Sequence, residues 1–296
     1  MEFYVYHENR EGIYMNQLIV ENINFSYGKK SILRDINFKV ENGLIGLLGK
    51  NGAGKTTLIK ILVTLYRPSS GSIVFNGYKY NNYTNEIRKY LGYLQQDFNM
   101  YKNLTGLDYL KFVAKMRNIK NIDEEIKEIC DMLNLDKYIK KRIGTYSGGI
   151  KRRLGIAQAI LGDVKLIILD EPTVGLDPEE RNEFRKAIKK VSTDKIVIMS
   201  THITEDIEFL CDKLIVLKDK TVKFEGSVEN FIEYNKYNIC QEIVNKIKFD
   251  EIINTEKVIS YKVEENKVCV KYIAKNNKKP AENITLQDAY INFLEE

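Results

Sequence analysis

The chain has 296 residues, of which 44% are hydrophobic and 29% charged, and its 46 basic and 41 acidic side chains give a formal net charge of +5. This composition excludes wholesale disorder and fibrous classes, and the length allows one large domain with a smaller appendage. The small basic excess is spread along the chain, so a nucleic-acid partner is not indicated.

Cysteine spacing and apolar runs exclude further classes of protein. The cysteines form no CxxC pair, which predicts reduced thiols in a cytoplasmic protein rather than a zinc site or a disulfide framework. They are Cys130, Cys211, Cys240 and Cys269. Apolar runs such as Leu166–Leu169 are far shorter than the roughly 20 residues of a membrane span, and residues 1–11 lack the apolar core of a signal peptide. We expect no transmembrane helix and a short arm over residues 1–16, with Met15 as an alternative start.

The first part of the chain, from residue 17 to about 74, has the pattern of strands that lead into a helix. Residues 18–27 and 35–40 have strand character, and residues 44–49 form a buried apolar run. This run enters a glycine loop, and the segment 55–66 after the loop is helical in pattern. The order is therefore strand, loop, helix.

A helical insert is predicted over residues 104–161. Thr105 and Asp108 are spaced as a capping box at its start. Farther along, one apolar stripe at helical spacing predicts a buried helix face. The stripe consists of Ile126, Ile129, Cys130 and Leu133.

Strands and helices then alternate. The apolar segment 166–170 predicts a buried strand, and a helix follows over 177–191, with Asp177 as N-cap, Pro178 as first residue and Glu180 as N3 partner. Another buried strand is expected over 195–202. Such alternation favours a parallel sheet with helices on its faces.

Beyond Gly226 the pattern changes again. It predicts a polar helix, a hairpin of residues 258–263 and 268–273, and a final helix capped by Thr285 and Asp288. The apolar face of that helix would contain Leu286, Ala289, Tyr290, Phe293 and Leu294. We therefore expect a small α+β domain over residues 227–296.

The strongest motif is the run Gly49–Thr57, which has the phosphate-loop spacing GxxxxGK[ST] between a buried strand and a helix. Glycines let successive N–H groups and the helix N-terminus point at phosphates. Lys55 would neutralise phosphate charge and Thr56 would ligate Mg²⁺. A flexible glycine turn is the alternative interpretation, and the strand-loop-helix context disfavours it.

Two adjacent carboxylates end the strand 166–170. Asp170 is placed to hold Mg²⁺ beside the nucleotide, and Glu171 is placed to orient or deprotonate the attacking water. The alternative, an acidic pair that merely ends a strand, is disfavoured by the phosphate loop upstream.

A second glycine motif, Tyr146-Ser147-Gly148-Gly149-Ile150-Lys151-Arg152-Arg153-Leu154, precedes that strand. It resembles the signature sequence of ABC ATPases. Ser147 and two glycines at a helix start make a further anion-binding terminus. The resemblance implies a head-to-tail dimer, in which the signature of one subunit closes over the phosphate loop of the other.

The remaining ABC elements match at single positions. Tyr27 resembles the aromatic residue that stacks on adenine, and Gln96 the glutamine that contacts Mg²⁺ and water and senses the membrane partner. Asp177 matches a position in the loop that crosses the dimer interface in this family. His202 resembles the switch histidine that contacts the γ-phosphate. A lone histidine is usually a surface or satisfied core residue, but His202 directly follows a buried strand; His7 receives the ordinary interpretation.

The resemblance therefore implies an α/β fold, namely a P-loop NTPase cassette over residues 17–226 with an N-terminal antiparallel β subdomain, a mostly parallel core sheet and the helical insert. Catalysis is assigned to Glu171, His202, Lys55 and Gln96, and the metal to Thr56, Gln96 and Asp170. The nucleotide would be held by Tyr27, Gly49, Asn51, Gly52, Ala53, Gly54, Lys55, Thr56, Thr57, Ser147, Gly148, Gly149 and Asp177.

The function implied is that of an ATPase with ATP and Mg²⁺ that powers a separate integral-membrane permease as a homodimer or heterodimer. The form of the signature and the C-terminal segment 285–294 resemble the drug- and peptide-antibiotic-resistance export branch. The protein would lie on the cytoplasmic face of a bacterial membrane, held only through the permease. The transported substrate is not encoded here, because in this architecture the permease selects it.

Three departures from the common ABC pattern concern no phosphate or metal ligand: Tyr146, Ile150 and Gln95 replace the usual leucine, glutamine and proline. Two alternatives remain open. A soluble ABC ATPase acting on ribosomes or DNA would usually have two cassettes or a long coiled coil between Gln96 and Ser147. A regulatory, non-hydrolysing partner would normally lack Glu171 or His202.

Overall fold

A computed structural model describes residues 15–96, 100–265, 267–274 and 281–295. Most of the expected arm 1–16, including His7, lies outside these residues. Asn16 belongs to the fold, since it is buried and its Nδ2 donates to Asn42 Oδ1 and to the Asp194 carbonyl, both at 2.9 Å. Among the described helices, none is long and apolar enough to cross a membrane.

The chain divides into two compact units. The first comprises the residues up to His202 together with Ile215–Glu225, and the second comprises Ile203–Leu214 together with Gly226–Glu296. The second unit thus contains a segment from the middle of the chain in addition to the expected 227–296. That residues 227–296 form a domain of their own stays a prediction.

The first unit contains an antiparallel sheet of order β2-β1-β4-β5. Its strands are β1 (Gln17–Tyr27), β2 (Lys30–Glu41), β4 (Ser70–Phe75) and β5 (Tyr78–Lys79). Alternate residues of β1 such as Leu18 and Val20 are buried, as expected for a sheet with one face on the core.

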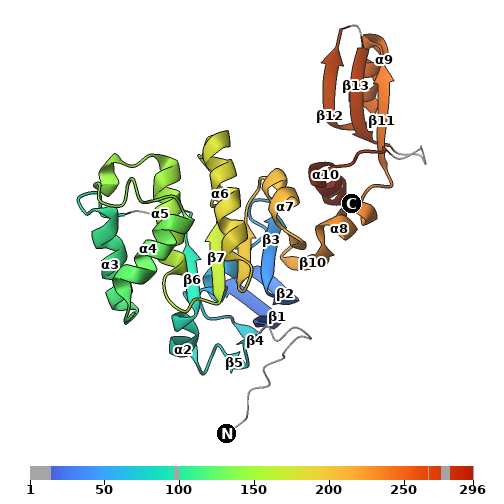
Figure 1. Ribbon diagram of the computed structural model, residues 1–296. Helices are drawn as coiled ribbons and strands as arrows, with labels where there is room; N and C mark the ends of the chain where they lie inside the picture. Colours follow the sequence, from blue (N-terminus) through green and yellow to red (C-terminus); the bar gives the residue numbers. More distant parts are fainter. Residues whose placement is uncertain (1–14, 97–99, 266, 275–280, 296) are drawn as a thin grey trace. The chain divides into compact units, whose positions relative to one another are not determined.

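The core sheet has the order β10-β9-β3-β8-β7-β6 (Figure 1). Its strands are β3 (Gly43–Gly49), β6 (Leu91–Leu94), β7 (Leu166–Asp170), β8 (Ile196–Ser200), β9 (Lys213–Lys218) and β10 (Thr221–Ser227). The four strands β3, β8, β7 and β6 are parallel. Every residue of β7 and β8 is buried, which explains their continuous apolar sequences. The carboxyl ends of β3, β7 and β8 therefore meet at one edge.

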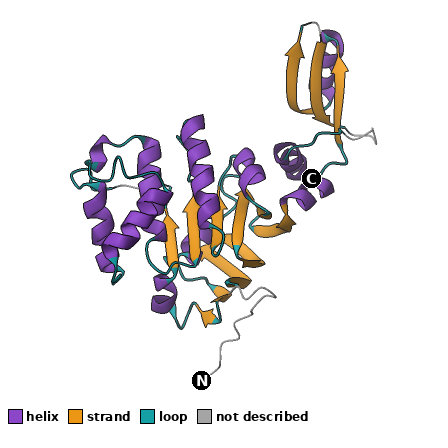
Figure 2. Ribbon diagram, viewed as in Figure 1, coloured by secondary structure: helices purple, strands orange, loops and turns teal. Residues whose placement is uncertain are grey.

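The helices of the first unit lie against this sheet or gather in the helical insert beside it (Figure 2). They are α1 (Lys55–Leu62), α2 (Thr84–Lys89), α3 (Gly106–Met116), α4 (Ile122–Met132), a short 3-10 turn (Ile143–Thr145), α5 (Gly148–Ile160) and α6 (Pro178–Val191). In the insert, α3 contacts both α4 and α5. The predicted cap is confirmed, because Thr105 Oγ1 accepts from the Asp108 N–H at 3.1 Å. All four residues of the predicted stripe are buried.

The second unit holds an antiparallel sheet of order β11-β13-β12. Its elements are α7 (Thr204–Leu210), α8 (Val228–Tyr234), β11 (Ile239–Val244), α9 (Lys246–Thr255), β12 (Lys257–Glu264), β13 (Lys267–Ile273) and α10 (Leu286–Glu295). The predicted hairpin is confirmed as β12–β13. The sequence pattern missed β11 and α9, which pack with it around Tyr272 and Phe249.

Helix α10 begins with the predicted capping box. Thr285 Oγ1 accepts from the Asp288 N–H at 3.2 Å, and Asp288 Oδ2 accepts from the Thr285 N–H at 3.0 Å. The predicted apolar face faces the interior of this unit: Leu286 and Ala289 are buried, and the other three residues are half-buried. The buried surface of α10 extends beyond this face to Asp288 and Asn292; Asp288 binds Lys271 at 2.7 Å, and Asn292 donates to the Asn235 carbonyl at 2.8 Å.

Candidate active site

The glycine loop connects β3 to α1 and has backbone angles that only glycine adopts easily. Gly52 has φ 82° and Gly54 has φ 107°. A Cβ on Gly54 would lie 2.6 Å from Leu33 Cδ2 and 3.1 Å from the Ile32 carbonyl oxygen. The loop can therefore curl tightly only with glycine at this position.

Lys55, the first residue of α1, lies inside this loop. Its ammonium donates to the Gly49 carbonyl at 2.5 Å and to the Lys50 carbonyl at 3.4 Å. Burial lowers the pKa of Lys55, while the charges of Glu171 and Asp170 act in the opposite direction. One buried cation thus faces the two carboxylates that the sequence predicted beside it.

Asp170 ends β7 and is 3% exposed. Its burial, together with the neighbouring Glu171 charge, raises its pKa, and Lys55 partly opposes this. A buried carboxylate with incomplete compensation suits a site that receives a cation. Within the described residues no cluster of three or more His, Cys, Asp or Glu side chains could hold a metal. Magnesium nevertheless fits, because it commonly uses one or two carboxylates together with substrate phosphates and water.

Glu171 is held in a strained backbone conformation, with φ 47°. Its N–H donates to the Ser200 carbonyl at 2.9 Å, and its carbonyl accepts from the Arg152 guanidinium at 3.3 Å. The carboxylate Oε2 lies 2.9 Å from His202 Nδ1 and accepts from the His202 N–H at 3.4 Å. The segment that follows β8 therefore contacts the carboxylate that follows β7.

The other loop and metal residues differ in exposure. Asn51, Gly52 and Thr56 are exposed, so the Thr56 hydroxyl is accessible in the first turn of α1. Gly49 and Thr57 are buried, and Ala53 is half-buried, with its N–H donating to the Lys50 carbonyl at 3.0 Å. Gln96 is exposed just after β6.

Tyr27 belongs to an aromatic group beside α1. The residue is 47% exposed, and its ring meets Phe25 edge-on at 5.0 Å and Tyr66 edge-on at 6.0 Å. Hydrogen bonding with Tyr66 and desolvation raise the pKa of Tyr27, and a hydrogen bond with Thr57 opposes them. The tyrosine is thus next to the helix that begins in the phosphate loop, with part of its ring open to a ligand.

The signature residues form a separate cluster at the start of α5. Ser147 is the N-cap, and its Oγ accepts from the Ile150 N–H at 3.3 Å. The Ser147 hydroxyl donates to Glu180 Oε1 at 2.8 Å, and the Gly149 N–H donates to the same oxygen at 3.1 Å. Asp177 caps α6 by accepting from the Glu180 N–H at 2.8 Å.

Sequence reasoning missed two residues here. Glu180 was expected only to complete the Asp177 cap, and Arg152 was assigned no role. Arg152 also donates to the Gln95 carbonyl at 3.4 Å, so it links the segment before Gln96 to Glu171. Both contacts join distant parts of the chain, and no local spacing in the sequence encodes them.

The departures from the common signature have local explanations. Tyr146 is buried, and its hydroxyl donates to the Tyr138 carbonyl at 2.8 Å within the helical insert. Ile150 contributes only its backbone N–H to the Ser147 cap. Neither substitution removes a donor from the start of α5.

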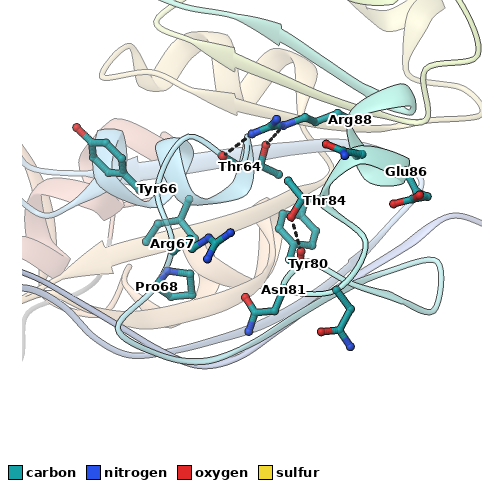
Figure 3. A pocket seen from close by; sticks show the side chains of 12 residues that line it. Thr64, Tyr66, Arg67, Pro68, Tyr80, Asn81, Thr84, Glu86 and Arg88 are labelled. Carbon is teal, nitrogen blue, oxygen red and sulfur yellow. Dashed lines mark hydrogen bonds between the residues drawn. The ribbon is translucent and has the colours of Figure 1, made fainter.

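A polar pocket of about 440 Å³ elsewhere in the first unit is distinct from this site (Figure 3). Arg88 donates to Thr64 Oγ1 at 2.7 Å and to its carbonyl at 3.2 Å, and Thr84 Oγ1 donates to the Tyr80 carbonyl at 2.7 Å. None of the predicted site residues lines it.

Comparison with known proteins agrees with this geometry. The family model described as ABC transporter matches residues 33–174. The chain is 39% identical to the uncharacterized ABC transporter ATP-binding protein YdbJ of Bacillus subtilis, over 72% of this chain and 70% of that one. It is 37% identical to the linearmycin resistance ATP-binding protein LnrL of the same organism, over 68% and 66% of the two chains.

A solved structure supports the same assignment. The chain is similar to cbiO1 from Clostridium perfringens, described as part of the ABC transporter complex cbiONQ, with a TM-score of 0.67 and 27% identity over 73% of this chain and 91% of that one. The expected fold class, with its antiparallel β subdomain, parallel core and helical insert, is confirmed. A chain with this fold, these motifs in this order and such relatives belongs to the ATP-binding subunits of the ABC transporters, a family of ATPases.

Proposed function

We propose that this chain is the motor of an ABC exporter, which hydrolyses Mg-ATP between two ATPase subunits and drives a separate permease. The observation that carries the proposal is the arrangement of Lys55, Asp170 and Glu171 around one loop, with His202 on the Glu171 carboxylate. A buried cation, two carboxylates and a histidine at the edge of a parallel sheet suit phosphoryl transfer to water.

Each residue has a distinct role in this proposal. Lys55 and the loop N–H groups bind the β- and γ-phosphates, and Tyr27 stacks on the adenine. Glu171 accepts a proton from the attacking water, while His202 keeps the Glu171 carboxylate oriented and contacts the γ-phosphate. Gln96 also orients the water. Catalysis is then mainly electrostatic positioning.

The metal residues are Thr56, Asp170 and Gln96. When bound, magnesium supplies charge compensation for the phosphate oxygens. The raised pKa of Asp170 supports this role, because the burial that raises it leaves a carboxylate that gains from a nearby cation.

Two anion-binding termini in one chain support a dimer. The phosphate loop and the start of α5 both present N–H groups at a helix N-terminus. One nucleotide does not require both from the same subunit. We therefore propose that Ser147, Gly148, Gly149 and the Asp177 loop close over ATP bound to a second subunit, whether identical or different.

The remaining partner is an integral-membrane permease. ATP-binding subunits of this family act with such permeases, and the relative LnrL is named for resistance to linearmycin. An antibiotic-export role on the cytoplasmic face of a bacterial membrane is accordingly proposed. Co-purification of a polytopic membrane protein with the tagged chain from mild detergent tests it; capture of ribosomes or DNA by a wholly soluble chain would contradict it.

The catalytic assignment is tested by Glu171→Gln. We expect Mg-ATP binding to persist while turnover falls by roughly two orders of magnitude or more, since a positioned general base commonly contributes that much. The variant should also accumulate as an ATP-bound dimer, measurable by light scattering. Unchanged turnover would contradict the assignment.

Lys55→Ala is the contrasting variant. It removes the ammonium from the phosphate loop and should lose nucleotide affinity itself, measured with a fluorescent ATP analogue. Tight Mg-ATP binding by this variant would contradict the role of the loop.

A further inference from the structure

The start of α5 already holds an anion from its own chain. One carboxylate oxygen of Glu180 accepts both from the Ser147 hydroxyl at 2.8 Å and from the Gly149 N–H at 3.1 Å. These are two of the donors that the proposed dimer offers to the γ-phosphate of a partner. A carboxylate at a helix N-terminus has the charge sign and acceptor oxygens that a phosphate would present.

The fit of Glu180 at this position is close. A Cβ on Gly149 would lie 2.3 Å from Glu180 Cδ and 2.4 Å from Oε1. Only glycine at this position lets the carboxylate approach the first turn of α5. Glycine at 149 is therefore required for the intramolecular contact in this geometry.

The backbone of Glu180 is fixed by its place in α6. It lies in the first turn of that helix, where its N–H donates to Asp177 Oδ1 at 2.8 Å. In a capping box the N3 carboxylate returns to the N-cap N–H, but here it extends to Ser147. The loop proposed to cross the dimer interface is thus tied to the signature of its own subunit.

Building on the dimer of the proposed function, we propose that Glu180 is an autoinhibitory placeholder: its carboxylate occupies the signature anion site until the γ-phosphate of a partner displaces it. The Ser147 hydroxyl has one proton and the Gly149 N–H has one, so neither fully serves the carboxylate and a phosphate at once. Closure of the dimer then requires these two charge-assisted hydrogen bonds to exchange partners.

The test uses the full chain in the Glu171→Gln background, where ATP-bound dimers should accumulate. Glu180→Gln removes the charge and leaves a weaker acceptor at nearly the same size. We expect the ATP concentration for half-maximal dimer formation, followed by light scattering, to fall by about threefold to tenfold, since charge-assisted hydrogen bonds are about twice as strong as neutral ones.

Glu179→Gln is the matched control. It removes the same charge from the same turn of α6. Glu179 is exposed, and the contact with Ser147 is made by Glu180 instead. An equal shift in both variants, or weaker dimerisation in Glu180→Gln, overturns the placeholder role. A gain in dimerisation is a readout that simple destabilisation would not produce.

A second measurement separates this inference from the proposed function. Binding of a fluorescent ATP analogue to the monomer should be equal in both variants, because the hydrogen bonds described for Glu180 go to Ser147, Gly149 and Asp177, which lie outside the phosphate loop. Altered monomer binding in Glu180→Gln alone overturns the inference. If the Glu171→Gln parent binds ATP but never dimerises, the dimer of the proposed function fails and the placeholder role fails with it.

Discussion

At the scale of single residues, the active site is assembled at the expense of stability. Glu171 has φ 47°, in a region that non-glycine side chains adopt at a cost of about 1–3 kcal/mol. Asp170 is a carboxylate buried beside another carboxylate. Both features place negative charge where a phosphate-bound cation would bind. Both lower the folding stability of the ligand-free protein.

Asp170→Asn should therefore stabilise the nucleotide-free protein. A raised pKa means that this carboxyl favours the folded state most below its unfolded pKa, and that this contribution is lost as pH rises through the folded pKa. At pH 7 the ionised group costs stability, so the amide should raise Tm by about 2–4 °C. Scanning calorimetry at pH 7 and pH 4 measures the effect.

The gain should shrink toward pH 4, because the raised pKa lets the wild-type carboxyl take up a proton in the folded state, which removes the buried charge. Glu179→Gln, which removes an exposed charge, controls for a general change in net charge. A gain that is the same at both pH values would show that burial of the ionised carboxylate is not its cause. Mg-ATP hydrolysis should be lost in Asp170→Asn at either pH.

The candidate site residues could be proposed from the sequence because their motifs are local, and their roles stay predictions. The spacing of Gly49–Thr57 and the carboxylates after a buried strand each specify a chemistry within a few residues. The contact between Ser147 and Glu180 joins residues 33 positions apart, and that of Arg152 with Gln95 joins residues 57 apart. Such contacts depend on how α5 packs against its neighbours, which spacing alone does not determine.

At the scale of elements, helix ends were predicted well and buried polar faces were not. The caps at Thr105, Asp177 and Thr285 all form as expected. The buried surface of α10 extends beyond its predicted apolar face and includes Asp288, because Lys271 on β13 supplies a partner there. A periodicity argument sorts side chains by type, so it cannot foresee a charged residue that is buried against a partner far along the chain.

The ion pair between Lys271 and Asp288 connects α10 to the three-stranded sheet. The variant Asp288→Ala tests its contribution to stability. The change leaves the Lys271 ammonium, whose side chain is 18% exposed, without its carboxylate and also removes half of the capping box. We expect a loss of about 2–4 kcal/mol in the free energy of unfolding, measured in urea. Asp288→Asn should cost less, because the amide oxygen can still accept from the Thr285 N–H.

The exposed pair Lys262–Glu264 in the same unit is the matched control. Glu264→Gln should leave the urea midpoint unchanged, since exposed ion pairs contribute little. Equal effects of Asp288→Ala and Glu264→Gln would contradict the importance of burial.

At the scale of the whole molecule, the two ends of the segment that contains β11, α9, β12 and β13 lie side by side in space. The Ile239 carbonyl accepts from the Ala281 N–H at 2.8 Å. Helices α7, α8 and α10 form the rest of the second unit, and α10 contacts both others. The sheet can thus be removed without separating these three helices.

Two deletions should therefore behave differently. Replacing residues 240–280 by a short glycine-serine linker should preserve cooperative unfolding and ATP binding by the first unit. Truncation after Gly226 removes α8 and α10 from α7, where Ile207 and Leu210 are buried, and should increase binding of a hydrophobic dye and lower Tm. Equal dye binding by the two proteins would contradict this role of α10.

The path of the chain between its units also bears on proteolysis. The second unit takes α7 from the middle of the sequence, and the Glu208 carboxylate accepts from the Leu286 N–H at 3.1 Å while the Asp212 carbonyl accepts from the Val228 N–H at 3.1 Å. A protease that cut the peptide bond after Glu225 would leave two fragments that share this helix cluster. The nicked protein should elute as one particle in native buffer and fall apart only in denaturant, so an intact elution profile is no proof of an intact chain.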